Sequence, residues 1–246
     1  TSENRLDEAI VHYRKALSLK PNYVGGHVDL GAALAGQGDV DQAIVHYRKA
    51  LAIDPDAAGA HYNLGVALQA RKLTDDAIVH YRRSLRSDPR HARAQNNLGV
   101  LLRRGGHADE AIEHLRRAVE ITPDLVDAHV NLGVSLASRD ELNEAADCFR
   151  RALQIQPVLF EAHINLANTL LALGQVNAAI DQYQRTLQLR PDNTLSHLNL
   201  GVAFAGSGRI DEAMHHVRET LRINPDLAAA QAVLDRLLEM KSRELQ

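Results

Sequence analysis

The most constraining feature of the sequence is the spacing of its prolines. Consecutive prolines are 34 residues apart throughout, which holds for all seven in the chain: Pro21, Pro55, Pro89, Pro123, Pro157, Pro191 and Pro225. Self-similarity with a period of about 20 to 50 residues is the signature of a protein built from stacked repeats, each packing on its neighbours. The 246 residues are therefore predicted to form a series of repeats instead of one globular core.

Other positions recur with the same period when each repeat is numbered so that its proline is position 32. Position 7 is always leucine and position 20 always alanine, while position 24 is tyrosine or another larger apolar residue. Small residues at positions 8 and 20 let two helix backbones approach closely and receive the bulk of position 24. Position 8 is Gly31, Gly65, Gly99, Gly133, Ala167 and Gly201.

The apolar spacing within each repeat predicts two helices. Helix A is expected over about the first 14 positions and helix B over about positions 18 to 31, because apolar residues recur there three and four apart. Aromatic residues make up only 4% of the chain and tryptophan is missing, which favours close-packed helices over strands. The predicted fold class is all-α. Glycines that would supply a left-handed residue between the two helices are Gly38, Gly106, Gly174 and Gly208.

Period and fixed positions together resemble the tetratricopeptide-repeat (TPR) family over the whole chain, except that position 4 is mostly histidine where the family has tryptophan. The resemblance implies a right-handed superhelical solenoid of antiparallel helix pairs. Residues 1–23 are expected to be a partial repeat with helix B only, which predicts that the native chain continues upstream. Six complete repeats are expected over residues 24–227. Residues 228–246 are expected to form a C-terminal capping helix, although they could equally be the start of a further repeat.

Position 6 of helix A holds the candidate binding residues, since the family resemblance implies that the A helices line a concave groove. An asparagine amide offers a donor and an acceptor, so a column of asparagines can match the N–H and C=O of an extended peptide whatever its side chains. The alternative is that the column is structural and bonds to adjacent helices. The column is Asp29, Asn63, Asn97, Asn131, Asn165 and Asn199. Neighbouring groove residues expected to add specificity are Arg93, Asn96, Asp127, Glu161 and Asn168, together with Gln69, Arg103 and Arg104.

Three phrases, "AHYNLGVAL", "AHVNLGVSL" and "AHINLANTL", also resemble the TPR superhelix of O-linked N-acetylglucosamine transferases, in which a luminal asparagine ladder holds substrate peptides. That resemblance covers the repeats only. The leading hypothesis is a scaffold that binds a protein or peptide ligand in its concave groove. The alternative hypothesis is the substrate-recognition arm of a larger enzyme, such as a glycosyltransferase, whose catalytic domain is outside this sequence.

Several other functions are not supported by the residues present. A formal net charge of −3 argues against nucleic-acid binding, which needs clustered surplus Lys and Arg. No Gly-rich phosphate loop or nucleophile elbow is found, so no catalytic residues are assigned. Position 5 never carries the lysine that a family-type clamp for acidic chaperone tails would need. Thirteen histidines invite a metal hypothesis, but those one repeat apart are too distant to share an ion, so no metal or other cofactor is expected.

Two expectations concern the surroundings of the chain. No apolar run approaches the roughly 20 residues that span a bilayer, so direct membrane insertion is not expected. The uncovered N-terminal helix B could support self-association. The composition does not fix the compartment, and a cytoplasmic location is favoured.

Overall fold

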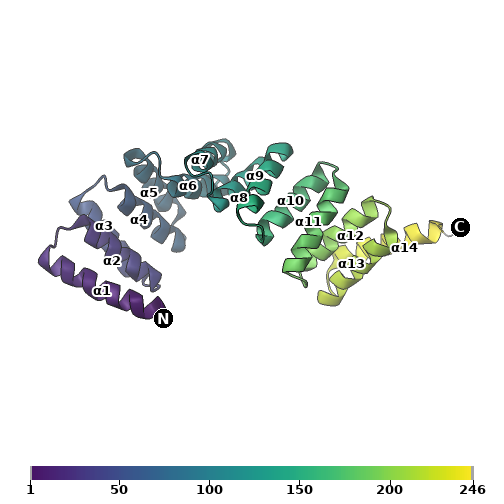
Figure 1. Cartoon of the computed structure of the whole chain (residues 1–246), viewed down its shortest axis with the longest axis horizontal. Coiled ribbons are helices and arrows are strands. Elements are labelled where there is room, and N and C mark those ends of the chain that lie inside the picture. The colour runs from purple at the N-terminus through teal and green to yellow at the C-terminus, as the bar shows by residue number, and fades with distance from the viewer. Residues whose placement is uncertain (1, 245–246) are drawn as a thin grey trace. The chain divides into compact units, whose positions relative to one another are not determined.

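The computed structural model describes the backbone of residues 2–244 and the side chains of residues 5–243. Within that range the chain is helical throughout, without strands, and short turns join successive helices (Figure 1). This confirms the all-α helical-repeat fold. The helices are α1 (Ser2–Leu19), α2 (Val24–Gly36), α3 (Val40–Ile53), α4 (Ala58–Ala70), α5 (Thr74–Ser87), α6 (Ala92–Arg104), α7 (Ala108–Ile121), α8 (Val126–Ala137), α9 (Leu142–Ile155), α10 (Phe160–Ala172), α11 (Val176–Leu189), α12 (Thr194–Gly206), α13 (Ile210–Ile223) and α14 (Ala228–Glu244).

The chain forms two compact units, an N-terminal unit of residues 1–123 and a C-terminal unit of residues 124–246. Within each unit, helices that follow each other in the sequence pack on each other. Some A helices also contact each other directly, as α2 and α4 do in the N-terminal unit and α8 and α10 in the C-terminal unit. The even-numbered helices α2 to α12 therefore form one layer of each unit, and the helices that follow them form the other.

In five of the six complete repeats, the core holds an apolar side chain of helix B placed over a glycine of helix A, and the sixth has Ala167 in place of the glycine. A Cβ atom added to Gly65 would lie 2.7 Å from the Tyr81 ring, and one added to Gly133 would lie 2.7 Å from the Phe149 ring. Both rings are buried, as are the position-7 leucines of the six complete repeats and their position-20 alanines. The packing of positions 8, 20 and 24 is therefore the one that the sequence predicts.

The turn from helix A to helix B places one residue in the left-handed region. Gly38, Gly106, Gly174 and Gly208 take φ values of 89°, 83°, 73° and 77°, as expected from their position. Lys72 and Asp140 occupy the same place in the two repeats that lack this glycine, with φ of 62° and 64°. A side chain with a Cβ is strained in this conformation, whereas glycine is not.

We expect Lys72→Gly and Asp140→Gly each to raise the free energy of unfolding by about 1 kcal/mol, because the strain is removed while the turn is kept. Urea denaturation followed by circular dichroism would measure the gain. The control is Gly38→Ala, which should lower stability by a similar amount. Unchanged or lower stability in both glycine variants would contradict the prediction.

Candidate functional site

The position-6 side chains lie on the A-helix layer of each unit. The N-terminal unit carries Asp29 on α2, Asn63 on α4 and Asn97 on α6, and the C-terminal unit carries the other three asparagines on α8, α10 and α12. Asp29 is exposed, and all five asparagines are half-buried. Each amide is therefore held against the protein on one side and accessible on the other.

In the N-terminal unit, Asn97 is held by a chain of hydrogen bonds. Its Nδ2 donates to the Tyr81 hydroxyl (3.3 Å), which donates in turn to Oε1 of Gln69 (2.9 Å). Asn96 donates from Nδ2 to Oδ1 of Asn97 (3.1 Å). Burial raises the pKa of Tyr81 to about 12, so its hydroxyl stays protonated and able to donate at neutral pH. Tyr81 is thus both the core residue of one repeat and the support for the position-6 amide of the next.

The C-terminal unit repeats this arrangement with different residues. The Tyr183 hydroxyl donates to Oδ1 of Asn168 (2.6 Å), and Nδ2 of Asn199 donates to the same oxygen (3.2 Å). Burial raises the pKa of Tyr183 to about 12 as well. Asn165 follows a repeat with Phe149 at position 24, which has no hydroxyl to offer. In the two repeats described here, a tyrosine at position 24 belongs to the hydrogen-bond network that holds the position-6 amide of the next repeat.

The supported amides keep part of their hydrogen-bonding capacity. An asparagine amide has two N–H donors and an oxygen with two lone pairs. One N–H of Asn97 and one of Asn199 are used within the protein. The side chains of Asn63 and Asn165 have no hydrogen-bond partner among residues 5–243. The geometry thus agrees with both the structural and the ligand-binding interpretation of the column. The amides of Asn97 and Asn199 bond to neighbouring repeats, and all four amides of this paragraph have groups left that could form hydrogen bonds with a ligand.

The other predicted groove residues differ in how accessible they are. Arg93 and Asp127 are exposed, and Glu161 is exposed but accepts a charge-assisted hydrogen bond from Arg190 (3.1 Å). Asn168 is exposed and accepts the two bonds described above. Asn96 differs, since only 8% of its surface is accessible and it orients Asn97. The structure therefore places Asn96 behind the predicted binding face and not on it.

Charged side chains of opposite sign lie on α6 and on the A helices α8 and α10. On α6 the ionisable side chains are Arg93, Arg103 and Arg104, and none of them forms an ion pair among the described side chains. The Nε atom of Arg103 is buried without a hydrogen-bond partner in that range. On α8 and α10 the charged residues are Asp127 and Glu161. The basic side chains of α6 would therefore favour acidic ligand side chains, and the acidic ones of α8 and α10 basic ligand side chains.

A second set of polar contacts recurs on the opposite side of the A helices and was not predicted. In three repeats the position-4 and position-23 histidines face each other, with Nδ1 to Nδ1 distances of 3.1, 2.9 and 3.0 Å for His27–His46, His61–His80 and His197–His216. Nε2 of the first histidine lies 2.9 Å from the carbonyl of the preceding position-32 proline. That carbonyl can only accept, so Nε2 donates, Nδ1 of the same ring accepts, and the position-23 ring donates.

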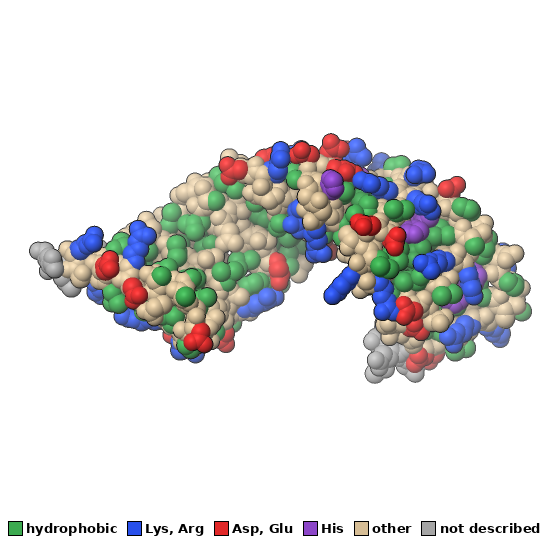
Figure 2. Space-filling view, turned by 180° about the vertical axis from the view of Figure 1, so that it is seen from behind, with side chains coloured by type: hydrophobic (Ala, Val, Ile, Leu, Met, Phe, Trp, Pro, Cys, Tyr) green, Lys and Arg blue, Asp and Glu red, His purple; other side chains and the backbone are tan. Residues whose placement is uncertain are grey.

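The signal for these pairs lay in the sequence, in the joint identity of positions 4 and 23. Where one member is glutamine the other is histidine, as in Gln95–His114 and His163–Gln182, which are also in contact (2.5 and 2.8 Å). The sequence prediction compared histidines one repeat apart, whereas the close partner is 19 residues away within the same repeat. Few imidazoles show on the face drawn in Figure 2, where acidic and basic side chains are interspersed.

Burial lowers the pKa of the position-23 histidines. The pKa of both His80 and His216 falls to about 4, mainly through burial and then through the partner imidazole. The pKa of His46 is also lowered, by burial first and by the positive charge of Lys49 second. These rings are therefore neutral at pH 7, which fits the donor and acceptor roles assigned above.

The described residues form neither a metal-binding cluster nor a membrane span. In that part of the chain, no three His, Cys, Asp or Glu side chains are grouped so that they could hold a metal ion. None of the described helices has the length and apolar character needed to cross a bilayer.

Two family models match the sequence. The model described as TPR repeat matches residues 1–38, 35–71 and 167–208, and the model described as tetratricopeptide repeat matches residues 56–124 and 92–158. Between them they account for most of the chain. A search of curated proteins found no match.

Solved structures with the same fold include proteins of different biological settings. PilF of Pseudomonas aeruginosa is 26% identical, with a TM-score of 0.74, and the match covers 87% of this chain and 97% of that one. Cut9–Hcn1 of the APC/C hetero-tetramer is 20% identical (TM-score 0.70), and the match covers 96% of this chain but 46% of that one. YrrB, described as a TPR protein with an unusual peptide-binding site, is 20% identical (TM-score 0.50), with 89% and 96% covered.

Proposed function

Because the chain belongs to the tetratricopeptide-repeat family, whose fold serves as a scaffold for protein interactions, we propose that it binds an extended segment of a partner protein along the A-helix layer. The position-6 side chains are the proposed contacts: the Asp29 carboxylate and the amides of Asn63 and Asn97 in the N-terminal unit, and the amides of Asn131, Asn165 and Asn199 in the C-terminal unit. They would grip the backbone of the ligand, and the charged residues beside them would select its side chains. No catalytic step is proposed for these residues.

The observation that carries this proposal is that hydrogen bonds within the protein already hold two of the amides in place. The hydroxyls of Tyr81 and Tyr183 help to fix the planes of Asn97 and Asn199 before any ligand arrives. A side chain that is already ordered loses less entropy on binding, so each bond contributes more to affinity. Adjacent helices pack about 8 to 10 Å apart and an extended peptide advances about 3.3 Å per residue, so one amide would meet about every third ligand residue.

The test uses the two amides that have no partner inside the protein. Peptides selected from a displayed random library against the wild-type chain would be labelled, and their affinities measured by fluorescence anisotropy. The double variant Asn63→Ala, Asn165→Ala should bind about 5- to 140-fold more weakly, because each lost bond is worth about 0.5 to 1.5 kcal/mol.

The matched control removes two exposed amides from α11 instead, as Asn177→Ala, Gln184→Ala, and should bind within twofold of wild type. Circular dichroism would verify that both variants keep their helical content. Equal affinity of the selected peptides for wild type and for Asn63→Ala, Asn165→Ala would show that recognition does not use this column, and the proposal would then be wrong.

A further inference from the structure

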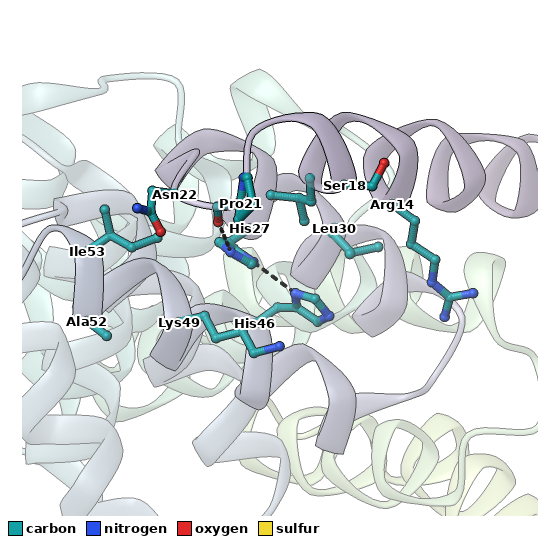
Figure 3. A pocket seen from close by; sticks show the side chains of 11 residues that line it. Arg14, Ser18, Pro21, Asn22, His27, Leu30, His46, Lys49, Ala52 and Ile53 are labelled. Carbon is teal, nitrogen blue, oxygen red and sulfur yellow. Dashed lines mark hydrogen bonds between the residues drawn. The ribbon is translucent and has the colours of Figure 1, made fainter.

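A pocket of about 570 Å³ opens between α1, α2 and α3 in the N-terminal unit (Figure 3). His27 forms part of its wall, whereas Asp29, two residues further along α2, belongs to the proposed peptide face. Two residues correspond to about 200° around a helix, so the pocket and that face lie on opposite sides of α2. It is therefore a separate candidate site.

The polar side chains that line this pocket are donors or carry positive charge. Arg14 and Ser18 come from α1, Asn22 from the turn, and His46 and Lys49 from α3, while no Asp or Glu lines it. Figure 3 shows His46 between the side chains of Lys49 and Arg14. Neither Arg14 nor Lys49 forms an ion pair or a hydrogen bond with any described side chain. Two cations thus face an open pocket without a counter-charge.

Two basic residues at the same repeat positions, Arg82 and Arg151, do have carboxylate partners. Arg82 donates to Glu110 (2.7 Å), which is 28 residues later in the sequence, and the residue 28 positions after Arg14 is Gln42. An amide thus stands where the other repeat has a carboxylate.

Lys49, the second basic residue of the pocket, also has an amide where its equivalent has a carboxylate. Arg151 donates to Asp124 (3.0 Å), which is 27 residues earlier, and the residue 27 positions before Lys49 is Asn22. The carboxylates that pair with Arg82 and Arg151 are therefore both replaced by amides around this pocket.

The electrostatic surroundings of the histidine pairs agree with this difference. Glu212 and Glu219 raise the pKa of His216 against the effect of burial, and Asp76 does the same for His80. At His46 the charges that act on the ring, Lys49, His27 and Arg14, all lower its pKa. The potential at this pocket is thus positive without internal compensation.

We propose that this pocket binds two neighbouring carboxylates of an acidic peptide segment, with Arg14 and Lys49 as their partners. Carboxylates fit because the equivalent residues Arg82 and Arg151 bind the side chains of Glu110 and Asp124. Two separate groups fit because Arg14 and Lys49 come from different helices, and their counterparts Arg82 and Arg151 bind carboxylates of two different residues. The amides of Asn22 and Gln42 leave these places open to a ligand.

The probe is a fluorescein-labelled peptide of alternating aspartate and glutamate, with the corresponding asparagine–glutamine peptide as the uncharged control. Its anisotropy would be measured with the whole chain at low ionic strength, because such contacts are screened by salt. The double variant Asn22→Asp, Gln42→Glu supplies the missing carboxylates from within and is expected to weaken binding of the acidic peptide at least tenfold. Lys49→Gln should weaken it similarly.

Three control variants distinguish binding in this pocket from binding elsewhere on the chain. Arg151→Gln removes the same charge from an equivalent but already paired position and should leave affinity within twofold. The other two controls are double variants that alter the A-helix face: Arg93→Gln with Arg104→Gln, and Asn63→Ala with Asn165→Ala. Unchanged affinity for the acidic peptide in both keeps this inference independent of the proposed function.

Equal binding by wild type and Asn22→Asp, Gln42→Glu would overturn the proposal, as would an equal loss in Arg151→Gln. Competition by inorganic phosphate at concentrations where acetate is without effect would also overturn it, since the pocket would then be a phosphate site.

Discussion

Replacing Phe149 by alanine is expected to lower the free energy of unfolding of the C-terminal unit by about 3 to 5 kcal/mol. The ring is 1% exposed and lies over Gly133, where a Cβ would be 2.7 Å away. Glycine has no side chain that could move into the vacated space, so most of the cavity would remain. Urea denaturation followed by far-ultraviolet circular dichroism would measure the loss.

The chain offers its own matched controls for this prediction. Leu115 fills the corresponding place over Gly99, so Phe149→Leu should cost much less than Phe149→Ala. Val158 is 66% exposed, and Val158→Ala should change stability by less than about 0.5 kcal/mol. A loss below about 1 kcal/mol for Phe149→Ala would mean that the repeat collapses around the cavity, contrary to the tight packing described here.

The second large effect is a loss of stability in mild acid. The pKa of His80 and of His216 is about 4 in the folded chain and about 6.5 when unfolded, so between these values the unfolded state binds more protons. Stability is therefore complete above about pH 6.5 and falls progressively as the pH drops toward 4. Because the rings are only partly buried, we expect about 1 kcal/mol for each pair, less than the full pKa displacement would give.

Denaturation at pH 7.5, 6.0 and 5.0 would test this effect against the triple variant His46→Gln, His80→Gln, His216→Gln. Glutamine already occupies the equivalent place as Gln182, where it contacts His163 (2.8 Å). Carboxylates such as Glu110, whose pKa is lowered chiefly by Arg82, lose their ion pairs in both proteins, so the comparison isolates the histidines. An identical pH profile for wild type and variant would refute the assignment.

Much of the fold follows from local rules that a single sequence displays. The 34-residue proline period, the small residues at position 8 and the bulk at position 24 define helix pairs and their packing without any long-range information. The left-handed turn residues were predictable where they are glycine. At Lys72 and Asp140 the sequence gives no such sign, because the neighbouring helices impose the conformation on residues that disfavour it.

The candidate site was less predictable, because its geometry depends on pairs of side chains from different helices. The asparagine column is visible in the sequence, but its support depends on tyrosine hydroxyls that reach the next repeat, as Tyr81 reaches Asn97. Asn96, next to Asn97 in sequence, points toward the interior because adjacent residues on a helix differ by about 100°. The missing counter-charge around Arg14 becomes visible only when Arg14 is compared with Arg82, which occupies the same position in another repeat and binds Glu110.

Contacts that join only neighbours along the chain also determine how the molecule can be assembled during synthesis. The main contacts of α1 are with α2, and those of α2 are with α1, α3 and α4. Folding therefore closes only short loops, which is the topology associated with fast folding. Helices that leave the ribosome first can pack before later ones are translated. Each newly made helix would then extend the structure already formed, without requiring any earlier pairing to be undone.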